Sequence, residues 1–586
     1  MVMKIKCSKI LQYGALEIVA IYFSLLMVMS LLTGNLVYRR SQSLLAAAII
    51  VVLTSHLYSD RRKYFITWGA LGTLLASVLY IYYNLNDSSQ VYLAIKYLSF
   101  SLNESCLIIL TVSMLWQRTK KFILVLLLIL ALIIPIVFWG YYLSMDAWFA
   151  SDTLLAVMQT NLGESKEYLS DYFTVSGMAA IIFIVIVAGI VWRNMQSVLL
   201  VKEKKHFTAF ISLALLVSAT ACYKTRDNLI LNTGWKAKEN LQKYADFQKM
   251  QAQRKSIVRL NLQENGKQQG VFVLVIGESQ SKDHMSAYGY DKKTTPWLGE
   301  AFKQDNFIKF TNAYSCHTHT IPVLTYALTA KNQYNELQLE NAVSLLEVAE
   351  AAGYETAWLS NQIKYSAWDT PITVIASEAN QQDWINHNIG ETTVSNAYDL
   401  KLLDSLKSLK LTDKMLIVIH LMGNHGSYRE RYPRDFAVFS DMSSEVGSYD
   451  NSILYNDYVV SKIYEYVRSL PEFNCMIYFA DHADAVEEKL GHDASKFVWP
   501  MTHIPMYIGF SERFRQKDAA MVNILRNSQD KVFTNDLIFN IMLGLMNIKI
   551  PDIYEQENDI TSTYYNSDIQ RFKTLYGQRF VREDLQ

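Results

Sequence analysis

A succession of long apolar runs before residue 223 constrains the fold of this 586-residue chain more than any other feature. A helix that crosses a bilayer needs about 20 mostly apolar residues, because the hydrocarbon core is about 30 Å thick. The strong candidates are 18–38, 65–83, 122–143, 174–192 and 206–222, and the weaker ones are 43–58 and 97–116. The sequence therefore predicts an N-terminal polytopic α-helical membrane domain over residues 1–222, with five to seven helices.

Lysine and arginine are unevenly distributed among the short loops between these runs. With the N-terminus inside, the inner segments are rich in basic residues, including Arg61, Arg62 and Lys63. The outer loops hold only Arg39, Arg40, Lys96 and Lys166. Cytoplasmic loops carry this excess of basic residues. Five and seven spans have the same parity, so we expect everything after residue 223 to lie outside the cytoplasm.

Two segments, one before and one after the last two predicted spans, differ from the spans in composition. The outer loop 144–173 contains Thr160 and Glu164, which share one face if this loop is helical. Polar groups there could meet a lipid headgroup, although a solvated loop helix is the simpler interpretation of the residues alone. Residues 223–268 are charged and rich in glutamine, which indicates a helical tether outside the membrane.

From residue 269 to 586 the pattern changes to short apolar runs that alternate with helical stretches. The expected strands are 271–277, 356–360, 415–421, 475–481 and 506–510. Buried apolar strands that alternate with helices indicate an α/β domain with a mostly parallel sheet and flanking helices. The formal net charge of the whole chain is zero, so its charge gives no indication of a nucleic-acid partner.

Polar residues follow three of the expected strands. Glu278 follows the first strand, His425 lies shortly after the third, and Asp481 and His482 follow the fourth. Two further histidines, His492 and His503, come next along the chain. Active residues of such sheets gather at the C-terminal strand ends. Carboxylate oxygens with imidazole nitrogens are ligands for zinc, and manganese fits the same donors less well. These strand ends therefore predict a metal site.

The segment "NAYSCHTHTIPVLTYALT", residues 312–329, offers several candidate nucleophiles in a short loop. A metal site that transfers phosphoryl groups often uses a protein hydroxyl, because the metal lowers the hydroxyl pKa. This favours a serine or threonine of "SCHTHT" over Cys316. Only Cys316 and Cys475 lie in the polar half, so at most one disulfide is available there.

These motifs together resemble the phosphoethanolamine transferases of the Gram-negative inner membrane, within the alkaline phosphatase/sulfatase superfamily. The resemblance rests on "VLVIGES", "SCHTHT", "HLMGNHGSYRERYP" and "FADHAD", which occur in family order. It covers nearly the whole chain and implies a periplasmic sulfatase-like domain at 269–586 on an inner-membrane anchor. "CHTHTIP" lacks the proline and arginine of a sulfatase nucleophile motif.

The resemblance implies roles for individual residues. Glu278, Thr320, Asp481 and His482 would bind a catalytic zinc ion, with Thr320 as the nucleophile. His425 and His492, with His503 as a further candidate, would hold a second metal, contact substrate or handle protons. Thr160 and Glu164 match residues that hold the donor headgroup, which reverses the simpler interpretation of the outer loop. Thr318 is the alternative nucleophile if the alignment of the loop shifts by two residues.

The implied activity is the transfer of phosphoethanolamine from phosphatidylethanolamine to lipid A, to the lipopolysaccharide core or to another envelope glycan, by a monomer. Several departures from the family pattern leave the acceptor open: Ala156, His317, His319, the cysteine count and up to two additional spans. A phosphoglycerol transferase of the same superfamily is the nearest alternative. A non-catalytic membrane scaffold with a decayed enzyme domain is the alternative from another class.

Overall fold

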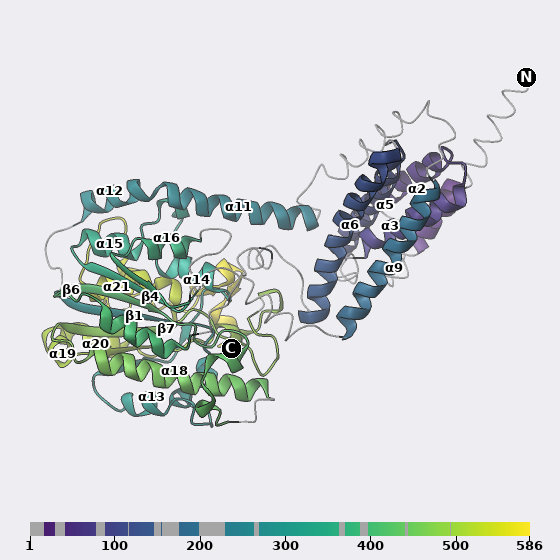
Figure 1. The fold of residues 1–586 in the computed structure, drawn as a ribbon. Helices are drawn as coiled ribbons and strands as arrows, with labels where there is room; N and C mark the ends of the chain where they lie inside the picture. The colour runs from purple at the N-terminus through teal and green to yellow at the C-terminus, as the bar shows by residue number, and fades with distance from the viewer. Residues whose placement is uncertain are drawn as a thin grey trace, which may run out of the picture. The chain divides into compact units, whose positions relative to one another are not determined.

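The computed structural model describes residues 17–27, 29, 42–77, 88–114, 117–145, 154, 175–198, 229–262, 269–362, 370–386, 397–439, 444–492 and 494–585. The chain divides into two compact units, one comprising Met1–Val157 and Tyr168–Lys238 and the other Met158–Glu167 and Glu239–Gln586. Each unit is considered separately below, and their elements are labelled in Figure 1.

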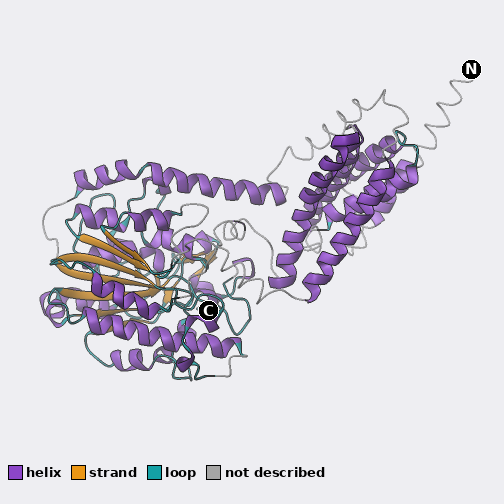
Figure 2. Cartoon of the chain, in the orientation of Figure 1, coloured by secondary structure: helices purple, strands orange, loops and turns teal. Residues whose placement is uncertain are grey.

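The first unit is helical throughout its described part (Figure 2). Its helices are α2 (Gln42–Ser55), α3 (Arg61–Ala76), α5 (Ser88–Met114), α6 (Gln117–Met145) and α9 (Val175–Val198). Polar side chains link them in a mainly apolar interior. Trp68 of α3 donates to the carbonyl of Leu102 in α5 at 3.0 Å, and the Tyr58 hydroxyl lies 3.0 Å from that of Ser113. Such bonds satisfy buried polar groups where no water competes.

One helix window in the described residues, Met178–Met195 of α9, is long and apolar enough to cross a membrane. Only 22% of that window is buried within the unit, so most of its apolar surface faces outward. Shorter apolar helices occur at Glu17–Met27, Leu44–Ser55 and Tyr97–Ser113. The predicted span at 206–222 lies outside the described residues, as do Thr160 and Glu164. The number of spans therefore remains a prediction.

The segment predicted as a tether forms α11 (Leu229–Lys249) and α12 (Gln251–Asn261). Arg254 of α12 is 1% exposed and packs its guanidinium on the Phe247 ring, 3.8 Å from the ring centre. It donates to the Glu347 carboxylate at 3.1 Å and lies 3.9 Å from that of Glu378. Burial and the Glu347 charge raise the pKa of Glu378 to about 8. The positive charge of Arg254 therefore offsets the cost of burying two carboxyl groups. The same contacts hold α12 against the rest of the second unit.

A seven-stranded sheet in the order β2-β8-β7-β1-β6-β4-β5 forms the centre of the second unit. Its strands are β1 (Gly270–Gly277), β2 (Phe307–Phe310), β4 (Glu355–Ser360), β5 (Gln381–Trp384), β6 (Lys414–His420), β7 (Phe473–Ala480) and β8 (Met506–Phe510). The strands β7, β1, β6, β4 and β5 pair in parallel, whereas β8 is antiparallel to both of its neighbours. The predicted α/β domain is thus confirmed, with a mixed sheet.

Helices cover both faces of this sheet (Figure 1) because alternate side chains of each strand point to opposite faces. Phe272, Leu274 and Ile276 of β1 enter one apolar core, while Val271 and Val273 enter the other. The first core also takes residues of α14 (Thr320–Ala327), α15 (Leu345–Ala351), α16 (Pro371–Ser377), α19 (Glu512–Lys517), α20 (Ala519–Asn527) and α21 (Ile538–Leu545). The second takes residues of α13 (Pro296–Ala301), α17 (Leu402–Ser408) and α18 (Glu445–Val467).

Two short pairings complete the second unit at the edge where the parallel strands end. The strand β3 (Ala313–Tyr314) pairs in parallel with β9 (Phe533–Thr534), which draws the chain before "SCHTHT" towards residue 535. The strand β10 (Lys573–Thr574) pairs with β11 (Arg579–Phe580). Because β8 is antiparallel, its beginning and the preceding His503 lie at this same edge.

Replacement of Arg254 by leucine should destabilise the second unit by about 3–5 kcal/mol, because two buried carboxyl groups lose their counter-charge. The matched variant on the same helix is Lys255→Leu, which breaks a partly exposed ion pair with Glu350 at 3.1 Å. That change should cost less than about 1 kcal/mol. Denaturant unfolding followed by tryptophan fluorescence measures both losses. Equal losses for the two variants would contradict the proposed role of the buried arginine.

Candidate active site

Glu278 is the first residue after β1 and is 1% exposed. The loop that follows β6 crosses directly over it, and the amide of Asn424 donates to the Glu278 carbonyl at 2.9 Å. Gly423 has a φ of +53°, and a Cβ atom there would lie 2.8 Å from the backbone nitrogen and oxygen of Glu278. Only glycine fits this close approach without strain, which explains the first glycine of "MGNHG", Gly423.

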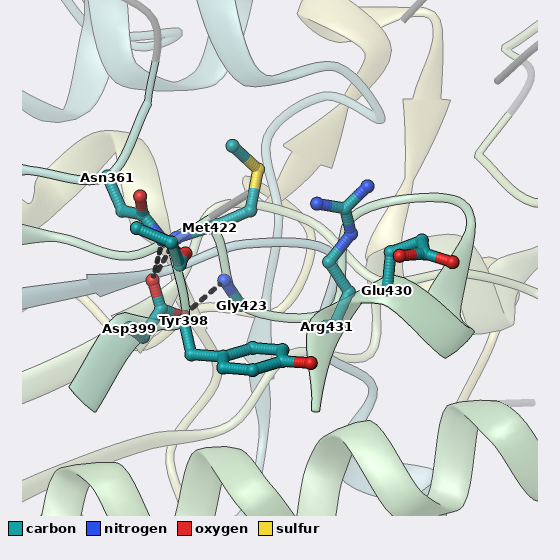
Figure 3. A pocket seen from close by; sticks show the side chains of 8 residues that line it. Asn361, Tyr398, Asp399, Met422, Gly423, Glu430 and Arg431 are labelled. Carbon is teal, nitrogen blue, oxygen red and sulfur yellow. Dashed lines mark hydrogen bonds between the residues drawn. The ribbon is translucent and has the colours of Figure 1, made fainter. Parts of the chain in front are cut away.

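Asp399 holds this crossing loop in place. Its carboxylate accepts from the backbone amides of Met422 at 2.9 Å and Gly423 at 2.8 Å, and from the Asn361 side chain at 2.8 Å. Figure 3 shows these contacts at the wall of a small hollow that is also lined by Arg431. A buried carboxylate that binds several amide hydrogens fixes the backbone that carries them.

Asp481 and His482 follow β7, the strand next to β1. Because Gly277 pairs with Ala480, the two strand ends place Glu278 and Asp481 side by side. Asp481 is fully buried, and its Oδ1 accepts from the amides of Ser279 at 3.0 Å and His482 at 2.7 Å. No described residue donates a hydrogen bond to its Oδ2. His482 Nε2 lies 3.4 Å both from this oxygen and from Glu278 Oε1.

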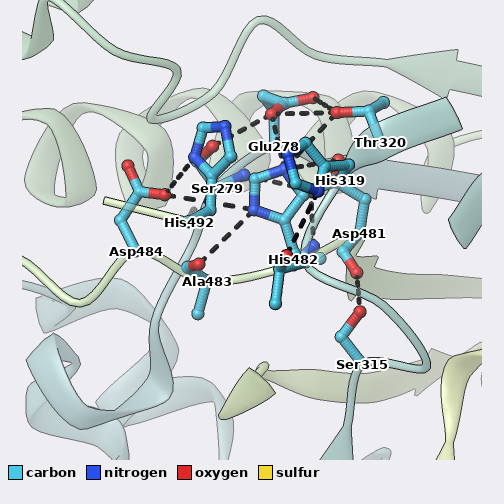
Figure 4. Close-up of polar contacts among 12 residues, drawn as sticks. Glu278, Ser279, Ser315, His319, Thr320, Asp481, His482, Ala483, Asp484 and His492 are labelled. Atoms are coloured by element: carbon cyan, nitrogen blue, oxygen red, sulfur yellow. Dashed lines mark hydrogen bonds and ion pairs between the residues drawn. The ribbon is translucent and has the colours of Figure 1, made fainter. Parts of the chain in front are cut away.

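Thr320 begins α14, so its side chain lies at the point where the "SCHTHT" loop turns into helix. Its hydroxyl lies 3.1 Å from Glu278 Oε2 and 3.4 Å from His482 Nε2 (Figure 4). Thr318, the alternative nucleophile, contacts Nδ1 of His319 at 3.2 Å instead. Cys316 is a buried free thiol whose pKa is raised well above its ordinary value by burial. The structure therefore brings Thr320 together with Glu278, Asp481 and His482.

Burial raises the pKa of both carboxyl groups in this cluster. The pKa of Glu278 rises to about 7, and that of Asp481 also rises to about 7, with the Glu278 charge adding to the effect of burial. Burial lowers the pKa of His482, against the opposing charge of Asp481. A cation among these groups would offset the cost of holding two carboxylates out of water. The donor set and the unpartnered Asp481 oxygen thus fit a metal ion.

A second candidate metal group shares His482 and adds Asp484 and His492. His492 Nδ1 lies 2.7 Å from Asp484 Oδ1, and the rings of His492 and His482 are 4.4 Å apart between centres. Although burial lowers it, the Asp484 charge raises the pKa of His492 to about 9. Burial alone would raise the pKa of Asp484, but the His492 charge holds it below its ordinary value.

The other predicted site residues have different surroundings. Burial lowers the pKa of His425 to about 3, and the Arg431 charge adds to this effect. Both ring nitrogens of His503 face carboxylates, Asp283 at 2.6 Å and Asp584 at 2.8 Å. His503 belongs to neither of the two metal groups found in the described residues.

Asn535 is a site residue that the sequence did not indicate. Its side-chain oxygen accepts from the Cys316 amide at 2.9 Å, and its nitrogen donates to the Asp481 carbonyl at 2.6 Å. Ser315 makes a parallel link, since its hydroxyl oxygen lies 2.5 Å from the carbonyl oxygens of both Asp481 and His317 and its one hydrogen bonds to either of them. These two residues join the threonine loop to the β7 end. The tetrapeptide "TNDL" around Asn535 carries no recognisable motif, and the β3–β9 pairing is what brings the preceding strand to this place.

Replacing Asp484 with asparagine should lower the pKa of His492 from about 9, because burial still lowers it while the charge and hydrogen bond of Asp484 are lost and only the charges of Glu278 and Asp481 still raise it. A smaller fraction of the imidazole would then be charged at neutral pH. Selective ¹³C-histidine labelling and NMR titration of the metal-free protein measure this, with His492→Gln assigning the signal. His503, which has other carboxylate partners, is the internal control. A His492 pKa that stays near 9 in Asp484→Asn would contradict the assignment.

Comparisons with known proteins show what this chain is similar to in sequence and in fold. Residues 271–548 match the sulfatase family. Phosphoethanolamine transferase EptC of Escherichia coli strain RS218 is 28% identical over 409 residues, 62% of this chain and 70% of that protein. Phosphoethanolamine transferase EptA of Helicobacter pylori is 30% identical over 301 residues, 48% of this chain and 54% of that protein. The membrane protein lipooligosaccharide phosphoethanolamine transferase A of Neisseria meningitidis shares the fold, with a TM-score of 0.60 at 20% identity over 85% of this chain and 97% of that one. The chain is therefore similar to phosphoethanolamine transferases over 62% of its length, and its residues 271–548 carry the match to the sulfatase family.

Proposed function

We propose that this protein transfers phosphoethanolamine from phosphatidylethanolamine to a cell-envelope acceptor, through a covalent intermediate on Thr320. The observation that carries the proposal is the position of the Thr320 hydroxyl, 3.1 Å from Glu278 and 3.4 Å from His482 in a buried carboxylate–imidazole cluster. The relatedness to phosphoethanolamine transferases supports the same substrate class.

Glu278, Thr320, Asp481 and His482 would hold one zinc ion, and His482, Asp484 and His492 are the candidates for a second. Nitrogen and oxygen donors of this kind suit zinc, with manganese as the second choice. Bound zinc would lower the pKa of the threonine hydroxyl and supply positive charge for the phosphoryl oxygens.

The reaction would proceed by two displacements at phosphorus. In the first, the Thr320 hydroxyl would give its proton to the Glu278 carboxylate, 3.1 Å away, while a bond forms between Thr320 Oγ1 and the phosphorus of phosphatidylethanolamine and the bond to the glycerol oxygen breaks. The leaving diacylglycerol oxygen would take a proton from His492, whose Nδ1 contacts Asp484 and whose Nε2 would face the substrate. In the second, an acceptor oxygen would displace Thr320 from phosphorus and give its proton to His492, directly or through His425, while the threonine oxygen takes its proton back from Glu278.

A lipid donor requires the site to work at a membrane surface. We propose that residues 1–222 form an inner-membrane anchor with a cytoplasmic N-terminus, that 223–268 connect it, and that 269–586 are the periplasmic catalytic domain. Thr160 and Glu164 would contact the donor headgroup. The acceptor would be lipopolysaccharide, at lipid A or the core, or another envelope glycan, and the enzyme would act as a monomer.

Incubation with phosphatidylethanolamine should add the mass of one phosphoethanolamine to the intact protein, because the first displacement leaves that group on Thr320. Thr320→Ala should show no added mass and should lose transfer activity by at least about 1000-fold. Thr318→Ala is the matched control two residues away, and it should retain the added mass. Intact-protein mass spectrometry is the measurement.

The same experiment separates the alternatives. Modification by phosphatidylglycerol in place of phosphatidylethanolamine would favour a phosphoglycerol transferase. Modification of Thr320→Ala but not of Thr318→Ala would move the nucleophile to Thr318. A protein that acquires no group from either lipid, and does not turn over labelled phosphatidylethanolamine, would be the non-catalytic scaffold.

Replacing Asp481 with alanine should reduce zinc affinity by more than about 100-fold, because a ligand is lost outright and not merely a supporting contact. Zinc competition with a chromophoric chelator measures the affinity without reference to activity. Asp283→Ala is the control, since that carboxylate faces His503 and not the cluster. Unchanged zinc affinity in Asp481→Ala would refute the proposed ligand set.

A further inference from the structure

The segment 573–577, near the C-terminal end of the sequence, packs on the loop that carries Thr320. The Thr574 hydroxyl donates to the Ser315 carbonyl at 2.8 Å. Two residues further on, the Tyr576 ring lies 5.0 Å from the His317 ring between centres. Two side chains of this segment thus contact the threonine loop, one at its backbone and one at a side chain.

A row of rings continues from Tyr576 to the centre of the site. The His317 ring lies 5.4 Å from that of His319, and the His319 ring lies 5.5 Å from that of His492 at an interplanar angle of 90°. His319 immediately precedes Thr320, and Figure 4 labels both residues. Movement of His317 would therefore be transmitted to the residue that sets the backbone direction of Thr320.

His317 depends on neighbouring rings for its position. Its side chain is 4% exposed, and its Nδ1 is buried without a hydrogen-bond partner among the described residues. A buried ring nitrogen without a hydrogen-bond partner costs free energy, and this cost disfavours the buried position of the ring. Packing against Tyr576 and His319 is the compensating interaction, because ring pairs at these separations attract one another.

The backbone of the segment is strained where it presents Tyr576. Leu575 and Tyr576 have φ values of +50° and +53°, in the left-handed region that residues with a Cβ atom rarely adopt. Non-glycine residues persist there only when surrounding contacts impose the conformation. Gln333 supplies such contacts, since its side chain accepts from the Gly577 amide at 3.2 Å and donates to the Lys573 carbonyl at 2.8 Å.

We infer that Tyr576 is a positioning residue for the nucleophile: through the rings of His317 and His319 it holds the backbone that orients the Thr320 hydroxyl. This inference rests on the proposed role of Thr320. It also gives the two histidines that depart from the family pattern a common purpose, as the inner members of one row of ring contacts. A shift of about 1 Å in a nucleophile can reduce the rate about 100-fold, so loss of these ring contacts should slow the chemical step.

The test uses the full-length protein in lipid nanodiscs and three variants. Tyr576→Ala removes the ring, Tyr576→Phe keeps it, and Tyr564→Ala removes a 73% exposed tyrosine of the same C-terminal region as the matched control. Tyr576→Ala should lower kcat for phosphoethanolamine transfer by about 10-fold or more, with KM within about twofold of the wild-type value. Tyr576→Phe should keep at least about half of kcat, because the ring contact remains. Tyr564→Ala should match the wild type.

Hydrogen exchange of residues 312–320 in the metal-free protein gives a readout that needs no activity. These amides should exchange faster in Tyr576→Ala, while those of β1 and β6 keep their protection. A His317→Ala variant covers the case in which Tyr576→Ala does not fold. If the rings of Tyr576 and His317 act together, the variant that carries both alanine substitutions should lose no more kcat than the single variant with the larger loss.

The outcomes separate the inference from the function on which it rests. A wild-type protein that transfers nothing, with a loop that loosens in Tyr576→Ala, would overturn the proposed transferase and leave the row of ring contacts as the support of the loop. An active wild type matched by Tyr576→Ala in kcat and in exchange would overturn the inference. A rise in KM at constant kcat would also overturn it, because Tyr576 would then contact substrate.

Discussion

The close approach of Glu278 and Asp481 is the constraint on which the rest of the catalytic unit depends. Two buried carboxyl groups, one with an oxygen that no described residue satisfies, are costly to hold together. The pairing of β1 with β7 imposes this proximity, and two further elements stabilise the surroundings. Asp399 fixes the loop that crosses Glu278, while Asn535 and Ser315 bind the backbone of Asp481. The sheet and its loops thus form a rigid frame for a cation and a threonine.

The loop that carries the proposed nucleophile has a different kind of support from the carboxylates. Glu278 and Asp481 take their positions from the strands that precede them, whereas Thr320 begins α14 directly after a loop that is held from several sides. Asn535 holds the Cys316 amide, Thr574 holds the Ser315 carbonyl, and rings hold the histidines. A site assembled in this way combines a fixed charge centre with a nucleophile whose orientation depends on side-chain packing. Substitutions in the loop contacts should therefore affect rate more than metal binding.

Much of this arrangement can be predicted from the sequence. The rest depends on strand direction and on contacts between distant segments, which local sequence patterns do not encode. Continuous apolar runs predict β1, β6 and β7 because strands buried on both faces have no polar side to alternate with. Glu278 and Asp481 are predicted to approach one another because parallel strands end at one edge. The direction of β8 is not predictable in this way, since a short apolar run is the same pattern in either direction. The contacts of His503 with Asp283 and Asp584 have no local sequence pattern either, because the three residues come from segments that are far apart in the sequence.

The pairing of β1 with β7 also bears on the order of events during folding. Ser279 and Asp481, which are hydrogen-bonded in the native site, are 202 residues apart in sequence. Contacts of such long range form late and slowly, because the intervening chain must first be ordered. The ligand cluster is therefore absent from the unfolded chain and from partly folded chains that lack this pairing. An ion that binds this cluster of side chains therefore binds only the folded domain, and it stabilises the folded state by mass action. Metal supply would then influence how much of the protein survives as well as how fast it works.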